Sequence, residues 1–207
     1  MARRTKEESA RTRERLIAAA REAFERHGYA GATLEQIART AGLTRGALYF
    51  HFPDKAALLR AMREQVDLPL IDRVGLELPA EAGVDALAAI ERFMLAVVTA
   101  IEQCETIRGT LQILFFHCEY VDALEPELAL RHRRHAELCE RLREAYRRAA
   151  AEGLLRSQVD PGLAALESAA FLSGLVRMWL LDRRGELVGP NLAALIHAHV
   201  ESRRAAA

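Results

Sequence analysis

The chain has 207 residues, of which 51% are hydrophobic and 28% charged, and only 12 Gly and 6 Pro interrupt it. Ala, Leu, Arg and Glu dominate, which favours helices over β-strands, so the predicted fold class is all-α. The formal net charge is zero, but residues 1–60 hold 12 Lys and Arg against 7 Asp and Glu, a net charge of +5, and the remainder therefore carries −5. This asymmetry indicates a basic module attached to an acidic one.

Cysteine usage and hydropathy argue against secretion and against membrane insertion. The three cysteines, Cys104, Cys118 and Cys139, have no CxxC spacing, and no apolar region follows the basic residues 1–6. We interpret this pattern as that of a reduced, cytoplasmic protein. No charge-free apolar run approaches the ~18 residues that a membrane span needs. The longest is 168–176, so no membrane partner is predicted.

The first predicted helix runs from about residue 8 to residue 27. Gly28 follows it as a left-handed cap, and its apolar residues recur at helical spacing: Leu16, Ile17, Ala20, Ala23 and Phe24. Thr33 followed by Gln36 has the form of a capping box, which predicts a short second helix directly after Thr33. Gly42 is expected to stop that helix.

Two further N-caps follow in the chain. Thr44 can cap a third helix, from Arg45 to about Phe50, and Asp54 can open a fourth. Beyond residue 65, prolines at 69 and 79 mark breaks between helices. Long amphipathic helices are then predicted at about 84–104, 107–122, 125–151, 161–183 and 190–204.

The stretch 34–52 has the layout of a helix-turn-helix, with a turn at 41–43 between two short helices. Thr44, Arg45 and Gly46 open the second helix, where free backbone N–H groups favour phosphate. Arg45 can reach a phosphate or a guanine edge, and Gly46 allows a close backbone approach. Small helical enzymes and structural proteins also contain this shape, so the layout alone leaves a structural role open.

The remaining side chains of this second helix divide between the two sides. Tyr49 can offer its hydroxyl to phosphate, and its ring, with that of Phe50, can contact thymine methyl groups. Leu48 is expected to face inward, onto Ile37 and Phe24.

These residues together resemble a known family. The DNA-binding signature of the TetR/AcrR family of repressors is similar to the pattern formed here by Thr33-Leu34, Ile37-Ala38, the run from Ala41 to Phe52, Lys55 and Leu58-Leu59. Two other segments, Ala2 to Glu8 and Gly174 to Leu181, resemble the branch that controls multidrug-efflux operons.

The resemblance implies a homodimeric repressor of double-stranded operator DNA that is released by a small hydrophobic effector. It implies a DNA-binding domain at 1–54 and a helical effector-binding and dimerisation domain at 55–207, with the dimer formed by helices at 163–182 and 192–199 and a linking helix at 54–72. The residues that would meet the operator are Thr33, Thr44, Arg45, Gly46, Tyr49, Phe50, His51 and Lys55, with Tyr49, His51 and Lys55 mainly on the DNA backbone.

A candidate effector pocket is suggested by large apolar residues that share segments with isolated polar ones. By analogy with the efflux branch we expect Ile90, Phe93, Met94, Val97, Leu114, Phe115, Leu138, Leu142, Leu172, Ser173 and Val176 to line it. For any one of them, a role in the hydrophobic core is the competing interpretation. An acyl-type effector and a metabolic or lipid operon, activation instead of repression, and an architectural DNA-binding protein are the alternatives.

His132, His135 and Cys139 fall on one face of a helix at a spacing that can ligate zinc. Three arginines at 131, 133 and 134 crowd the same turn, so we favour a solvated basic face beside a buried thiol. No metal and no cofactor are predicted. Motifs of nucleophilic, phosphate-binding or metal-dependent enzymes are not present, so the chain is predicted not to be an enzyme; a small helical enzyme with a hidden site is the alternative.

Overall fold

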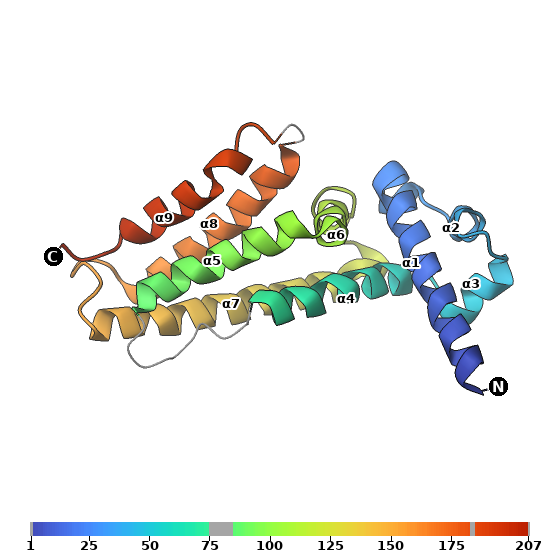
Figure 1. Cartoon of the computed structure of the whole chain (residues 1–207), viewed down its shortest axis with the longest axis horizontal. Coiled ribbons are helices and arrows are strands. Elements are labelled where there is room, and N and C mark those ends of the chain that lie inside the picture. Colours follow the sequence, from blue (N-terminus) through green and yellow to red (C-terminus); the bar gives the residue numbers. More distant parts are fainter. Residues whose placement is uncertain (1, 75–84, 183–184, 207) are drawn as a thin grey trace. The chain divides into compact units, whose positions relative to one another are not determined.

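The computed structural model describes residues 2–74, 85–182 and 185–206 (Figure 1). Within these residues the regular structure is helical and there is no β-strand, only an isolated antiparallel bridge between Leu155 and Arg204. The predicted all-α fold class is therefore confirmed. The chain forms two compact units, which we describe separately.

The first unit comprises residues up to 69 together with 105–128. Its helices are α1 (Ala2–Gly31), α2 (Leu34–Thr40), α3 (Arg45–His51), the first part of α4 (Lys55–Val74), α6 (Glu105–Phe116), the short 3-10 turn η1 (Asp122–Leu124) and the start of α7 (Glu125–Ala151). Within this unit α6 packs on α1. The predicted division into a DNA-binding domain at 1–54 and an effector-binding domain at 55–207 stays a prediction.

The second unit comprises 70–104 and 129–207. It contains the end of α4, α5 (Ala86–Gln103), most of α7, α8 (Pro161–Leu181), the short turn η2 (Gly189–Asn191) and α9 (Leu192–Glu201). α5 packs along α9. Within the described part of the chain, α8 is the one helix long and apolar enough to cross a membrane. Core helices of soluble proteins can be equally long and apolar, and 44% of the most apolar 18-residue stretch of α8 is buried inside the protein.

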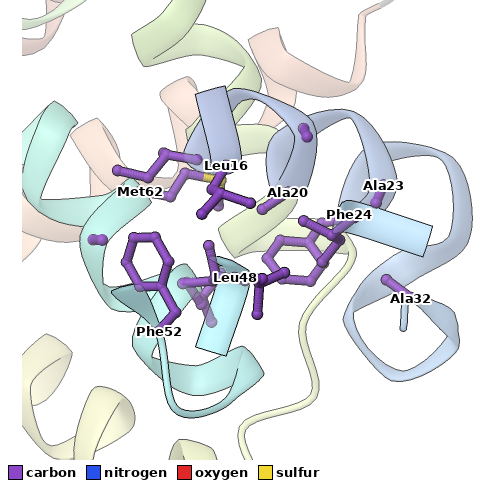
Figure 2. Packing of buried hydrophobic residues seen from close by; sticks show 14 of the residues in the cluster. Leu16, Ala20, Ala23, Phe24, Ala32, Leu48, Phe52 and Met62 are labelled. Carbon is purple, nitrogen blue, oxygen red and sulfur yellow. The ribbon is translucent and has the colours of Figure 1, made fainter. Parts of the chain in front are cut away.

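The core of the first unit fixes α2 and α3 against α1 and α4. Figure 2 shows Leu16 and Phe24 of α1, Leu48 of α3, Phe52 directly after α3, and Met62 of α4 converging on one apolar cluster. Leu48 has no exposed surface, as predicted, and it shares the cluster with Ile37 and Phe24. A side chain of this size, fully buried, contributes about 1.5–3 kcal/mol to folding, so the core holds α3 in place by its inward face.

The predicted helix caps are present. The Thr33 hydroxyl accepts from the Gln36 backbone N–H at 3.2 Å while the Gln36 side-chain oxygen accepts from the Thr33 N–H at 2.9 Å, which completes the capping box. Thr44 accepts from the Ala47 N–H at 3.2 Å. Asp54 accepts from the N–H of residue 57 at 2.7 Å. These bonds satisfy amides that would otherwise lack partners at each helix start.

Several predicted helix ends differ from the structure. α1 begins at residue 2 instead of 8, since residues 2–8 contain no helix breaker. It continues to Gly31 across a kink at Gly28, whose φ of 70° is positive as predicted but whose ψ of 166° is not that of a left-handed helical cap. α6 ends at Phe116, six residues before the predicted end, because the following backbone turns away to bond α1: the carbonyl of His117 accepts from the Tyr29 N–H at 2.8 Å.

Candidate nucleic-acid interface

Helix α3 has a buried side and an exposed side, separated by helical periodicity. Leu48 points into the core, whereas Thr44, Arg45 and Gly46 at the start of the helix are exposed. Tyr49 is 43% exposed and Phe50 82% exposed. Phe50 is the most exposed large hydrophobic side chain within the described residues. Together, Tyr49 and Phe50 place two aromatic rings on the exposed side of α3.

Arg45 and Tyr49 form one polar unit on this exposed side. Their spacing of four residues places them on the same helix face, and the Arg45 Nη2 donates to the Tyr49 hydroxyl at 3.3 Å. The guanidinium carbon also lies 5.4 Å from the centre of the Tyr49 ring, a cation–π distance. The hydrogen bond that Arg45 donates to Tyr49 raises the pKa of Arg45. A guanidinium is charged at neutral pH in any case, so it can neutralise a phosphate.

A surface hollow of about 490 Å³ lies between α2 and α3. Most of its lining is polar or charged, from Thr33, Glu35, Gln36 and Arg39 on the α2 side and Arg45 of α3; the apolar Ala38 and Leu43 complete it. Two of the residues predicted to meet DNA, Thr33 and Arg45, therefore border the same concave surface, although they lie 12 residues apart in the sequence.

The turn between α2 and α3 is fixed by a residue that the sequence did not single out. Gly42 has φ +63°, a left-handed conformation that glycine adopts without strain. The Arg15 Nη2 of α1 donates to the Ala41 carbonyl at 2.6 Å, and a Cβ on Gly42 would lie 3.3 Å from that same nitrogen. Arg15 therefore ties the turn between α2 and α3 to α1. Nothing in its sequence context distinguishes it from the other arginines of α1.

Of the other predicted interface residues, His51 is half-buried at the end of α3, with its ring edge-on to Phe50 at 5.2 Å. Lys55, the first residue of α4, has partners that the sequence did not predict. Its ammonium donates to the carbonyl oxygens of Tyr29, Ala30 and Ala32 at 2.7, 3.1 and 2.9 Å. The contact of each predicted residue with DNA stays a prediction.

The predicted effector residues fall in both units. Leu114 and Phe115 belong to the first, where Leu114 packs partly against the core cluster, and the other nine belong to the second. Ile90, Met94 and Leu142 have no exposed surface, Leu172 and Val176 are also buried, and the remaining ones are half-buried. Buried apolar residues fit a closed pocket and a core equally well, so this set also stays a prediction.

The histidine and cysteine residues of α7 are spread over its surface. His132 and His135 are exposed, while Cys139 is half-buried, less than the predicted buried thiol. The His135 Nδ1 lies 3.0 Å from the Arg131 carbonyl. Over the residues whose placement is described, no three His, Cys, Asp or Glu side chains lie close enough together to hold a metal ion.

Comparison with known proteins assigns both parts of the chain. Residues 16–62 match the family of bacterial regulatory proteins called tetR, and residues 85–201 match the C-terminal region of MAATS-type transcriptional repressors. The chain is 34% identical over 184 residues to the HTH-type transcriptional regulator TtgR of Pseudomonas putida, with 87% of this chain and 86% of that protein covered. It is 29% identical to AcrR of Shigella flexneri, with 87% and 83% covered.

Solved structures agree. NalD, the secondary repressor of the MexAB-OprM multidrug efflux pump in Pseudomonas aeruginosa, superimposes with a TM-score of 0.82 at 29% identity, covering 96% of this chain and 98% of NalD. SmeT of Stenotrophomonas maltophilia in complex with triclosan has a TM-score of 0.75 at 26% identity, covering 94% and 92%. The chain is therefore a transcriptional repressor of the TetR family, close to repressors of multidrug efflux pumps.

Proposed function

We propose that this repressor binds a palindromic operator as a cytoplasmic homodimer, is released by a small hydrophobic molecule, and controls a multidrug efflux operon. The DNA-binding part of this proposal rests on the exposed face of α3. That face presents the Arg45 guanidinium and the rings of Tyr49 and Phe50 to solvent, while the fully buried Leu48 anchors the opposite face in the core. The efflux assignment is supported by the relatives, among them a repressor of the MexAB-OprM pump.

In this proposal the outer face of α3 enters the major groove. Arg45 and Tyr49 bind phosphate or base edges together, Phe50 contacts thymine methyl groups, and Gly46 lets the helix start approach the backbone. Thr33, Thr44 and His51 supply hydrogen bonds to phosphates. Phosphate contacts provide most of the affinity, so binding weakens steeply as salt is raised.

The dimer interface is proposed on the outer face of α8 and α9. Apolar side chains there are largely exposed in the single chain: Leu163, Leu166, Met178 and Leu181 are each 56–59% exposed and Leu195 is 42% exposed. A second copy related by a two-fold axis would bury the same face on both chains and present two recognition helices about 34–36 Å apart, one turn of DNA.

Effector release follows from linkage. A ligand that binds more tightly to the conformation in which the two recognition helices are wrongly spaced lowers the affinity of the dimer for its operator. The bound operator lowers the affinity for the ligand by the same factor. The eleven predicted effector residues give such a ligand an apolar wall with Ser173 as a polar group. α4 is continuous in sequence through both compact units, and we propose that it transmits the change.

The test begins by selecting bound duplexes from a random DNA library and measuring their affinity by fluorescence anisotropy. Arg45→Ala combined with Tyr49→Ala is expected to reduce affinity for the selected duplex by at least about 30-fold, since two groups each worth about 1–3 kcal/mol are removed. The variant should remain a folded dimer, because both side chains are exposed and lie outside the core.

A matched control is Arg26→Ala, which removes one exposed arginine of the same unit that pairs with Glu22 at 2.7 Å. It should change the affinity less than about threefold. Unchanged binding by the double variant would refute the assignment of α3. Triclosan is a suitable first effector probe, because SmeT binds it, and it is expected to release the duplex.

A further inference from the structure

One carboxylate lies among the basic groups of the proposed DNA-binding surface. Glu35, in the first turn of α2, is exposed and lines the hollow of about 490 Å³ between α2 and α3, together with the cations Arg39 and Arg45. Its charge acts on Arg45: the hydrogen bond to Tyr49 is the largest cause that raises the pKa of Arg45, and the negative charge of Glu35 adds to it. The hollow therefore holds groups of both signs.

The Glu35 side chain is not used inside the protein. Over the residues that the structure describes, its carboxylate has neither a hydrogen-bond partner nor an ion-pair partner, although Arg39 follows at the i, i+4 spacing that favours such a pair on a helix. The buried Glu127 of the same unit, by contrast, pairs with Arg63 at 2.8 Å. Glu35 therefore keeps its full capacity to accept hydrogen bonds from solvent or from a bound molecule.

The chemistry of a carboxylate limits what Glu35 can bind on DNA. An ionised carboxylate has acceptors only, and so do phosphate oxygens, so the two groups repel each other. Base edges in the major groove differ, because cytosine presents its N4 amino group as a donor and guanine presents O6 and N7 as acceptors. A guanidinium and a carboxylate that border one hollow therefore match the edge of a G·C pair better than they match the phosphate backbone.

Stabilisation of α2 is the competing role for Glu35. An acidic side chain in the first turn of a helix interacts favourably with the helix dipole. The two roles predict opposite results on DNA of unmatched sequence. Loss of helix stability disturbs the helix-turn-helix and weakens binding to every duplex. Removal of a charge that repels phosphate strengthens binding to an unmatched duplex, which is held mainly by phosphate contacts.

We propose that Glu35 is a specificity-determining residue of this repressor, which accepts a hydrogen bond from cytosine N4 in the operator and repels the phosphate backbone of unmatched DNA. This role rests on the proposed function of α3, because Arg45 borders the same hollow. It extends DNA recognition to α2 and names the base that is read. Specificity is a difference between two affinities, and Glu35 contributes to both of them: it bonds to the matched sequence and repels the unmatched one.

The experiment compares wild type, Glu35→Gln and the control Glu25→Gln on the selected duplex and on a scrambled duplex of the same composition, at one KCl concentration. Glutamine keeps the size of the side chain and removes its charge. Glu35→Gln is expected to bind the scrambled duplex more tightly and the selected duplex no more tightly, which lowers the ratio of the two affinities by at least about fivefold. Glu25 is an exposed glutamate of α1 outside the hollow, so its variant should keep the wild-type ratio. An unchanged ratio in Glu35→Gln, including equal weakening on both duplexes, would overturn the inference.

A change in the DNA tests the named base. A second selection from the random library, with Glu35→Gln, should lose the preference for cytosine at one position of each half-site. Replacing that C·G pair by T·A puts thymine O4, an acceptor, in place of the N4 donor. The wild type should then lose at least about fivefold in affinity. Glu35→Gln should lose less than about twofold, because its amide can donate to O4. Equal losses in both proteins, or identical base preferences at every position, would overturn the inference.

Failure of the proposed function has a different signature. If the wild type selects no sequence from the library, or if Arg45→Ala combined with Tyr49→Ala leaves its affinity unchanged, DNA recognition by α3 fails and the role of Glu35 fails with it. If the wild type binds its selected duplex through α3 but Glu35→Gln selects the same sequence with the same affinity ratio, only the role of Glu35 is refuted.

Discussion

A buried polar chain in the second unit makes the stability of this repressor depend on pH. The Tyr146 hydroxyl and the Ser168 hydroxyl lie 2.7 Å apart, and the Ser168 oxygen lies 2.9 Å from the His199 Nε2. The His199 ring also stacks on Phe171 with centres 3.9 Å apart. Burial first, and then the positive charge of Arg203, lowers the pKa of His199 from 6.5 to about 4.

The sign follows from which state binds the proton. Between pH 6.5 and about 4 the unfolded chain protonates His199 and the folded chain does not, so the free energy of unfolding falls as pH falls through this window. At full value such a displacement corresponds to about 3 kcal/mol. His199 is only half-buried, so solvent screening reduces the expected loss to about 1–2 kcal/mol.

The assay is urea unfolding at fixed protein concentration at pH 7.5 and pH 4.5, for wild type and for His199→Gln. Glutamine can still bond to Ser168 and does not titrate, so the comparison removes the contribution of carboxyl groups that titrate in both proteins. We expect wild type to lose about 1–2 kcal/mol more than the variant between the two pH values. Equal losses in both proteins would refute the argument that His199 is held neutral.

Two further predictions concern the second unit. Ser168→Ala removes a buried hydroxyl that bonds to both Tyr146 and His199, so both side chains lose a partner. The free energy of unfolding, measured by urea unfolding, should fall by about 1–3 kcal/mol. A loss below about 0.5 kcal/mol would contradict this, because it would mean that water replaces the hydroxyl at no cost. Leu166→Glu places a charge on the proposed dimer face and should yield a folded monomer by analytical ultracentrifugation. The control Val121→Glu, at an equally exposed apolar residue of the first unit, should leave the dimer intact. A dimeric Leu166→Glu variant would place the interface elsewhere.

The parts of the fold that were predictable are those with local causes. The capping residues Thr33, Thr44 and Asp54 bond to amides a few residues away, so their sequence context is sufficient. Leu48 was predictable because helical periodicity separates its face from that of Tyr49. Helix ends set by distant contacts were not, as the early end of α6 shows: it depends on a bond between His117 and Tyr29.

The candidate site divides in the same way. Arg45, Tyr49 and Phe50 follow from their positions on a short helix with a buried anchor. Arg15 and Lys55 act across 26 and 23 residues or more, and their partners are backbone carbonyls, which carry no sequence signal. The resemblance to the TetR/AcrR family draws attention to Lys55, but only coordinates reveal which atoms its ammonium contacts.

The most direct test of the account is a hydroxyl-radical footprint of the wild-type protein on its selected duplex. Two recognition helices on a symmetric dimer predict two protected patches related by the symmetry of the DNA, with centres about one helical turn, roughly 10–10.5 base pairs, or a multiple of it apart. Protection should disappear in the variant that combines Arg45→Ala with Tyr49→Ala. A single asymmetric patch, or protection that persists in that variant, would contradict DNA recognition by α3 of a dimer.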